Sequence, residues 1–280
     1  MAKYIIPIAP PDEDRESLRD RLAKAFKEVR DADDAGCQAI IDHDDELLAL
    51  LERWPSADAE ALWQEVRDRF AHLSAKGPCL RCGTCCRKAS PTLYEGDLEL
   101  IEGGWIPREA LYTLRKGEMA YSPRLQEAAP VEQDLVKVRE SADGLCAFVE
   151  DSLCRIHGHH PLQCRHLECW TGKHAGELSK KPRLDRRALF AGDETALALI
   201  TEFDAKISAE ALAEHIEKAA EGDEEAAARA LELIDLDGRL RAGIAERFGY
   251  DEDDQALLLG REALLVARVS GLVVTVIDGN

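Results

Sequence analysis

The sequence predicts a mainly α-helical protein with a small β-hairpin or β-meander insert that binds metal, which places the chain in the α+β class. Ala, Leu and Glu are abundant while aromatic residues make up 5% of the chain, and this composition favours helices. Apolar residues repeat at helical spacing on both sides of a middle segment. That middle segment holds eight of the nine cysteines, between residues 79 and 169.

Three helices are predicted before the cysteines. The first covers residues 12–35, where one helical face carries Leu18, Leu22, Phe26 and Val29. Apolar residues from 40 to 51 predict a second helix, which ends near Trp54–Pro55. A third helix, ended by Gly77–Pro78, has an apolar face made of Leu62, Val66, Phe70 and Leu73. We interpret these helices as a packing scaffold.

The middle segment predicts shorter elements. Residues 91–101 and 107–115 are expected to form two short helices. Residues 135–139 alternate like a strand. Residues 146–149 and 153–156 are predicted to be adjacent strands joined by a turn.

From residue 193 onward the composition predicts helices again. Ser208 is expected to be a helix N-cap, and Gly222–Asp223 is expected to end one helix and begin the next. The β-branched stretch 272–277 predicts either an edge strand or a buried helix end.

Charge divides the chain into three regions, which we interpret as domains. Residues 1–75 form an N-terminal helical region of net charge −8, residues 76–187 a cysteine-cluster metal-binding domain of +2, and residues 188–280 a C-terminal helical region of −13. The total of −19 argues against a binder of nucleic acid or of anionic membranes, because both need a basic surface.

No targeting or membrane-spanning segment is predicted. The apolar run at the start is short and interrupted by Pro7, and the stretch 263–277 is short and interrupted by Arg268. We therefore expect a cytoplasmic protein. In a reducing compartment, clustered cysteines are more typical of metal ligation than of disulfides.

The first cysteine cluster has the spacing C-x2-C-x2-C-C. A spacing of two lets both sulfurs face one cavity around a tight turn, and Gly83 supplies backbone freedom for that turn. Three cysteines in two such steps are typical of segments that hold three corners of an iron–sulfur cubane, and the same pattern contains the knuckle of structural zinc sites. The cluster consists of Cys79, Cys82, Cys85 and Cys86.

The second cluster adds four more thiols, and together the two clusters form the predicted ligand set. Its members are Cys146, Cys154, Cys164 and Cys169. Two groups of four could make two tetrathiolate sites, or one cluster with additional ligands. Cys37 lies far from both clusters in the sequence and is interpreted as a buried apolar residue.

Basic residues lie beside the cysteines. A tetrathiolate zinc or a four-iron cubane carries a net charge near −2, so neighbouring cations would offset it. The sequence therefore predicts cofactor-binding roles for Arg81, Arg87, Arg155 and Arg165. Four histidines also crowd the second cluster and are interpreted as loop residues or as replacement ligands: His157, His159, His160 and His166.

This pattern resembles the YkgJ-like CxxCxxCC family of zinc- or iron-chelating cysteine-cluster proteins. The resemblance covers about residues 76–170 and keeps the order and approximate spacing of all eight cysteines. Two positions depart from the family pattern. His160 stands where the family has an arginine before the proline, and His157 stands at the family's usual aromatic position.

The resemblance implies metal binding and leaves the metal and its role open. We favour a four-iron–four-sulfur cluster over zinc, because three cysteines at double x2 spacing with a remote fourth suit a cubane. The favoured role is redox chemistry, metal handling or cluster-dependent modification. The alternative is a structural zinc module for a protein partner.

The cysteine pattern is also similar to that of flagellin lysine-N-methylases. This similarity implies a third hypothesis, a protein lysine methylase that uses S-adenosylmethionine. The sequence contains no G-x-G-x-x-G, no P-loop and no C-x3-C-x2-C motif to support it. Whether the protein is an enzyme is therefore left open by the sequence.

Overall fold

The computed structural model describes residues 6–7, 9–30, 32–55, 58–75, 79–122, 127–141, 143–150, 153–168, 173–174 and 178–270. The chain forms two compact units, each built from two segments. Unit 1 consists of residues 1–90 with 140–180, and unit 2 of residues 91–139 with 181–280. The division into three regions at residues 75 and 187 rests on charge and stays a prediction.

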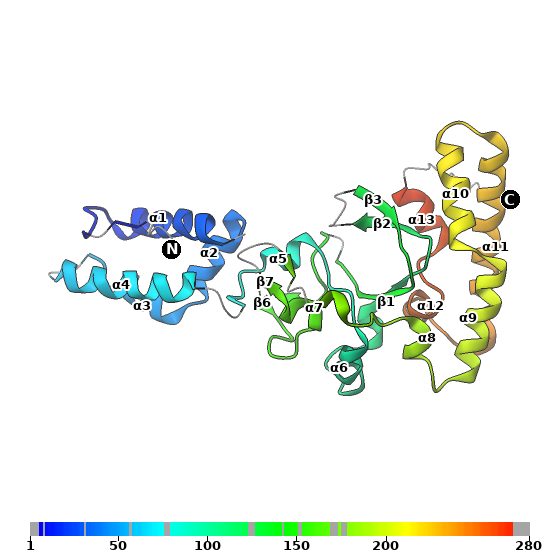
Figure 1. The fold of residues 1–280 in the computed structure, drawn as a ribbon, viewed down its shortest axis with the longest axis horizontal. Helices are drawn as coiled ribbons and strands as arrows, with labels where there is room; N and C mark the ends of the chain where they lie inside the picture. Colours follow the sequence, from blue (N-terminus) through cyan, green and yellow to red (C-terminus); the bar gives the residue numbers. More distant parts are fainter. Residues whose placement is uncertain are drawn as a thin grey trace. The chain divides into compact units, whose positions relative to one another are not determined.

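Four helices form the N-terminal part of unit 1 (Figure 1). They are α1 (Arg15–Val29), α2 (Asp34–Asp42), α3 (Asp45–Glu52) and α4 (Ala59–Ser74). Each helix begins after an aspartate whose carboxylate accepts a hydrogen bond from a backbone N–H of the first turn: Asp14, Asp33, Asp44 and Asp58. The prediction of one continuous helix over residues 12–35 is therefore wrong, because α1 ends at Val29 and α2 begins separately at Asp34. The predicted second helix is likewise divided between α2 and α3.

These four helices enclose an apolar core. Phe26 and Phe70 lie at its centre with ring centroids 4.7 Å apart. Cys37 is 1% exposed in this core and packs among leucine and isoleucine side chains. Its environment agrees with the interpretation of Cys37 as a buried apolar residue.

The rest of unit 1 carries the cysteines on short elements. These are α5 (Thr84–Lys88), β5 (Val149–Glu150), β6 (Leu153–Cys154), α7 (Leu162–Arg165), β7 (Leu167–Glu168), β8 (Lys173–His174) and the 3-10 helix η3 (Leu178–Lys180). Strands β5 and β6 pair in antiparallel fashion, with Val149 opposite Cys154. The hairpin predicted in the second cysteine cluster is confirmed, with strands shorter than expected.

Unit 2 begins with short helices and two strand pairs. Its first elements are η1 (Glu95–Asp97), α6 (Leu98–Glu102), η2 (Arg108–Ala110), β1 (Leu111–Leu114), β2 (Met119–Ser122), β3 (Glu127–Pro130) and β4 (Leu135–Val138). Strand β1 pairs with β4, and β2 pairs with β3, both in antiparallel fashion. The strand predicted at 135–139 is confirmed as β4. The helix predicted at 107–115 is wrong, because Leu111 and Leu114 are buried by pairing with that strand.

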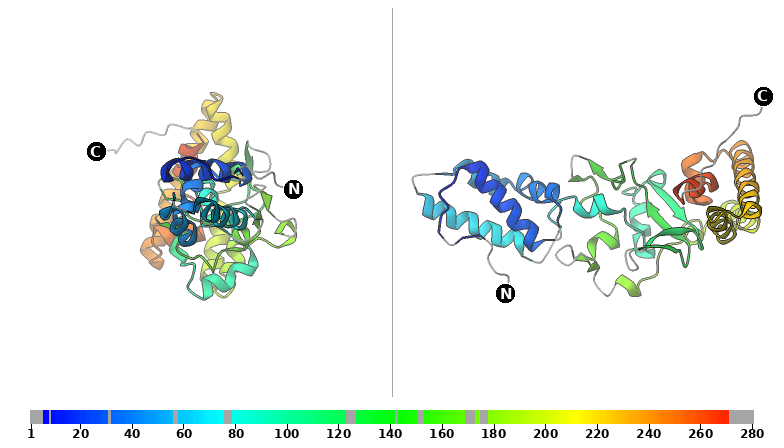
Figure 2. Two further views of the ribbon diagram at one scale, coloured as in Figure 1. Left: turned by 90° about the vertical axis from the view of Figure 1, so that its left-hand side faces the viewer. Right: turned by 90° about the horizontal axis from the view of Figure 1, so that it is seen from above.

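Six helices complete the described part of unit 2. They are α8 (Arg186–Leu189), α9 (Glu194–Lys206), α10 (Ala209–Ala220), α11 (Glu224–Phe248), α12 (Glu252–Leu258) and α13 (Ala263–Val269). Ser208 caps α10 and Asp223 caps α11, as predicted. Helices α10 and α11 lie side by side and share an apolar core with α13 (Figures 1 and 2).

The described elements are mainly helical with short antiparallel strand pairs, so the predicted fold class is confirmed. None of the helices within the described ranges is both long enough and apolar enough to cross a membrane. The element predicted at 272–277 lies outside the described residues.

Candidate metal centre

The first cysteine cluster is shaped by two left-handed residues. Arg81 has φ 59° and Gly83 has φ 71°, and α5 begins directly after Gly83. A left-handed arginine is strained because its Cβ crowds the backbone, whereas glycine adopts this conformation freely. The Arg81 backbone N–H donates a hydrogen bond to Cys79 Sγ at 3.4 Å. This turn directs Cys79 and Cys82 into different surroundings and leaves Cys85 and Cys86 on α5.

The second cysteine cluster is joined to α5 through the backbone. The Cys146 N–H donates to the Cys86 carbonyl oxygen at 2.9 Å, which links positions 60 residues apart in the sequence. Cys154 lies on β6, paired with β5, and Cys164 lies on α7. The hairpin and α7 therefore bring the later thiols towards α5.

Five thiols gather here, and we call them the five-thiol group: Cys85, Cys86, Cys146, Cys154 and Cys164. The Sγ atoms of Cys85 and Cys86 are 3.7 Å apart. Charge on other members of the group contributes to the raised pKa of Cys86, Cys146, Cys154 and Cys164, and a charge on Cys79 also contributes to the raised pKa of Cys164. The structure thus mixes the two sequence clusters instead of keeping them as two local tetrads.

Burial controls the ionisation of this group. It raises the pKa of Cys146 to about 11 and raises the pKa of Cys154 and of Cys164. Cys85 differs because the Cys86 side chain hydrogen-bonds to its sulfur, which lowers the pKa of Cys85 to about 7. That same contact, together with burial, raises the pKa of Cys86. Several buried thiolates at this position need a cation beside them, and a thiophilic metal ion meets that need.

Cys79 lies with two histidines, and we call this set the Cys–His group: Cys79, His157 and His160. Their ligand atoms all lie within 4.8 Å of one another. The two imidazole rings meet edge to face, with centroids 4.3 Å apart. Burial lowers the pKa of His157 and lowers that of His160 to about 4, which favours the neutral, metal-binding imidazole.

Cys82 contacts Thr84 and the apolar core of α1–α4. Its thiol donates to the Thr84 hydroxyl at 3.6 Å, and its side chain packs against the core of α1–α4. Cys37 lies near enough for a charge on Cys82 to help raise its pKa to about 11, although burial is the main cause. Cys169 lies outside the described residues.

Arg87 ties α5 to the helical part of unit 1. Its guanidinium donates to Asp33 at 2.5 and 3.0 Å and to the Cys82 carbonyl at 3.1 Å. This contact lowers the pKa of Asp33 to about 2. Gly36 lies so close to Thr84 that a side chain there would overlap the hydroxyl. The start of α2 and the start of α5 are therefore built against each other.

We call the described cysteine-bearing part of unit 1, residues 79–88, 143–150 and 153–168, the cysteine region. The other predicted basic residues lie at its surface. Arg155 donates to the Ala147 carbonyl at 3.1 Å and pairs with Glu150 at 3.7 Å. The charges of Arg155 and Arg81 oppose the rise in the pKa of Cys154, and Arg87 contributes to the lowered pKa of Cys85. Arg165 is exposed on α7. Their predicted roles towards a cofactor stay predictions.

The sequence alone left His157 and His160 open as either loop residues or replacement ligands. Nothing in their spacing to Cys79, nearly 80 residues earlier, indicated that they would meet it. The available signal was the crowding of histidines around the second cysteine cluster. His166 instead places Nδ1 3.0 Å from the Leu162 carbonyl oxygen.

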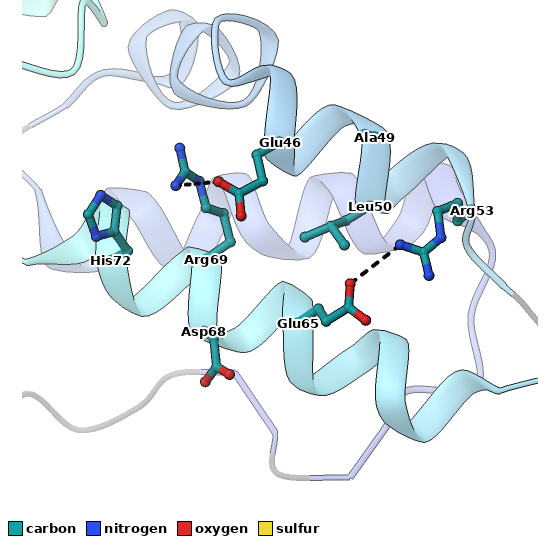
Figure 3. A pocket seen from close by; sticks show the side chains of 8 residues that line it. All are labelled: Glu46, Ala49, Leu50, Arg53, Glu65, Asp68, Arg69 and His72. Atoms are coloured by element: carbon teal, nitrogen blue, oxygen red, sulfur yellow. Dashed lines mark hydrogen bonds and ion pairs between the residues drawn. The ribbon is translucent and has the colours of Figure 1, made fainter.

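A separate surface groove lies between α3 and α4 (Figure 3). Arg69 pairs with Glu46 at 2.6 Å and Arg53 with Glu65 at 3.4 Å along its walls. Arg69 also pairs with Asp44, the N-cap of α3. These charges pair with one another across two helices, as in a stabilising surface network.

Comparison with known proteins gives one family match. Residues 78–183 match the model of the CxxCxxCC family, whose domain is described as zinc- or iron-chelating. The resemblance inferred from the cysteine spacing is therefore confirmed for this segment, and metal chelation is supported. No curated protein and no solved structure matches the chain.

Proposed function

We propose, from the match of residues 78–183 to a family of zinc- or iron-chelating domains, that this protein holds a thiolate metal centre, favoured as a four-iron–four-sulfur cluster. The favoured role is redox chemistry, metal handling or cluster-dependent modification, in the cytoplasm. The observation that carries this proposal is the five-thiol group, in which sulfurs of both sequence clusters meet. The eight clustered cysteines remain the pool from which its ligands are drawn.

The number and spread of the sulfurs support a multinuclear centre. A cubane takes four thiolates, one at each iron, and the five-thiol group offers more than four. The ligand atoms of the Cys–His group all fall within 4.8 Å of one another, whereas no three sulfurs of the five-thiol group do so among the described residues. Thiolates at the corners of a cluster are farther apart than thiolates around one ion.

The surrounding residues fit such a group. Cys146, at 6% exposed, lies where water is excluded, and Arg87, a residue of α5, is held by Asp33. Cations and backbone N–H groups near the sulfurs offset the negative charge of a thiolate cluster. When bound, an iron–sulfur cluster supplies reversible one-electron transfer.

Anaerobic purification of the full chain tests the proposal. We expect a brown, oxygen-sensitive protein that contains iron and acid-labile sulfide and shows a cubane signature in its Mössbauer spectrum. A colourless protein with stoichiometric zinc and no iron after the same purification would overturn the iron–sulfur assignment.

One distance favours the zinc alternative. The 3.7 Å between the sulfurs of Cys85 and Cys86 is close to the roughly 3.8 Å that two thiolates adopt around one tetrahedral zinc with Zn–S bonds of about 2.3 Å. In that case the region is a structural module that presents a surface to a protein partner. The methylase hypothesis also stays a prediction, and binding of S-adenosylmethionine to the purified protein tests it.

A further inference from the structure

We propose that the Cys–His group is a second metal site, distinct from the five-thiol group, which binds a divalent cation of the zinc class through one sulfur and two imidazole nitrogens. The inference does not depend on which metal the five-thiol group holds. It assigns Cys79 to a different ion from the later cysteines of its own sequence cluster.

The three side chains of the Cys–His group come from two separate segments of the chain. Cys79 approaches from the turn before α5, while His157 and His160 follow β6 on a short loop that ends at α7. All three ligand atoms lie within 4.8 Å of one another. Zinc bonds of about 2.0–2.1 Å to nitrogen and about 2.3 Å to sulfur require ligand atoms slightly closer than this, which small side-chain rotations provide.

The imidazole nitrogens provide a second, independent observation. Within the described part of the chain, Nε2 of His157 and Nε2 of His160 are both buried without a hydrogen-bond partner. A buried polar atom that lacks a partner is destabilising, and native structures keep few of them. One cation between the rings would satisfy both.

The donor set selects the cation. Two imidazoles and one thiolate suit zinc, which accepts nitrogen and sulfur ligands together, better than they suit an iron–sulfur cluster, which is held mainly by thiolates. The Arg81 backbone N–H donates a hydrogen bond to Cys79 Sγ, which holds the sulfur in position. With three protein ligands from the described residues, a tetrahedral ion keeps a fourth position for water or another ligand.

Burial and nearby positive charge both oppose a cation at this site. Burial is the largest cause of the lowered pKa of His160, and the charges of Arg165 and Arg81 add to it. Both side chains are exposed, however, and solvent screens their charge. The Cys79 thiolate offsets one positive charge at the centre of the group.

Metal analysis of histidine variants tests the inference. The full chain is purified anaerobically with zinc and iron supplied, as wild type and as His157→Gln, His160→Gln, His159→Gln and His166→Gln. We expect His157→Gln and His160→Gln to lose one zinc per chain, while His159→Gln and His166→Gln keep the wild-type content. Wild-type zinc content in His157→Gln and His160→Gln would overturn the inference.

A Cys85→Ser variant separates this site from the five-thiol group. If the two sites are distinct, it loses the metal of the five-thiol group and keeps the zinc of the Cys–His group. If it keeps all its metal, the proposed thiolate centre fails while the second site stands. If Cys85→Ser and His160→Gln each lose all metal, the two groups form one site and the inference fails.

X-ray absorption at the zinc edge of the wild-type protein gives a test that needs no variant. We expect a zinc shell that contains nitrogen with the multiple scattering of imidazole, together with sulfur. A zinc shell of sulfur alone would contradict the proposed ligands even if the histidine variants fail to fold.

Discussion

The cysteine region of unit 1 and the arginine network of unit 2 both bury ionisable groups, but they satisfy them differently. In unit 2, Arg186 is 2% exposed and donates to Asp134 at 2.6 Å and to Asp204 at 2.7 and 2.8 Å. Arg241 pairs with Asp237 at 2.9 Å and donates to the Gly260 carbonyl at 3.0 Å. Each of these arginines carries its countercharge within the same unit.

Among the described residues of the cysteine region, no arginine or lysine is buried between the thiols. Its arginines lie at the edge, paired to Asp33 or Glu150 or exposed to solvent. The thiols oppose one another's ionisation, and two imidazole nitrogens lack partners. The arginine network therefore pairs its charges within the protein, although Asp237 Oδ1 and Arg115 Nε are buried without a hydrogen-bond partner. The thiols of the cysteine region are instead left to a bound cation.

Removing the metal should have the largest effect on this comparison. Structural metal binding contributes on the order of 10 kcal/mol to the folding of a small domain, so a chelator under reducing conditions should unfold the cysteine region. We expect amide hydrogen exchange to accelerate strongly over residues 145–165 and to change little over residues 111–138. Equal protection of both segments with and without chelator would break the comparison.

Cys85→Ala tests the thiols directly. Because Cys85 lies within the five-thiol group beside Cys86, its loss should release the metal of that group and destabilise the cysteine region. The matched control is Cys37→Ala, which removes a sulfur from the apolar core of α1–α4. We expect that control to lower the free energy of unfolding by about 1 kcal/mol and to leave metal content unchanged. Metal loss in Cys37→Ala would contradict its place outside the site.

Arg186→Leu tests the other region. The substitution removes the arginine partner of Asp134 and leaves Asp204 with its longer contacts to Arg187 and Arg115. Breaking a buried pair of this kind costs about 3–5 kcal/mol. We expect chemical denaturation to show a less stable unit 2, while the metal content per chain stays at the wild-type value. A loss of metal in this variant would show that the two regions depend on each other.

Local signals in the sequence predicted much of the fold. The caps at Ser208 and Asp223 were correct because a cap depends on residues within one turn. The predicted helix at 107–115 failed because β1 is stabilised by β4, about 20 residues away in the chain, and periodicity does not contain that pairing. The break between α1 and α2 was missed because the apolar spacing continues towards Cys37 across the cap at Asp33.

For the candidate site, too, local signals in the sequence predicted one part and long-range contacts decide the other. The spacing of the cysteines indicated metal binding, and the family match supports it. Which sulfurs gather, however, depends on the left-handed turn at Arg81 and on the backbone bond between Cys146 and Cys86. Neither feature follows from a spacing of two residues. The approach of His157 and His160 to Cys79 depends on the same long-range contacts.

The smallest expected effect concerns that turn. Arg81 occupies a left-handed conformation that costs a residue with a Cβ roughly 1 kcal/mol, a strain that glycine does not have. Arg81→Gly should therefore bind metal more tightly than Arg81→Ala, since both variants remove the guanidinium but only glycine relaxes the backbone. We expect a difference of about fivefold in competition with a chelator, equivalent to roughly 1 kcal/mol. Equal affinities would show that the turn relaxes without cost, and that the position of Cys79 relative to α5 is then set by the bound metal instead of the backbone.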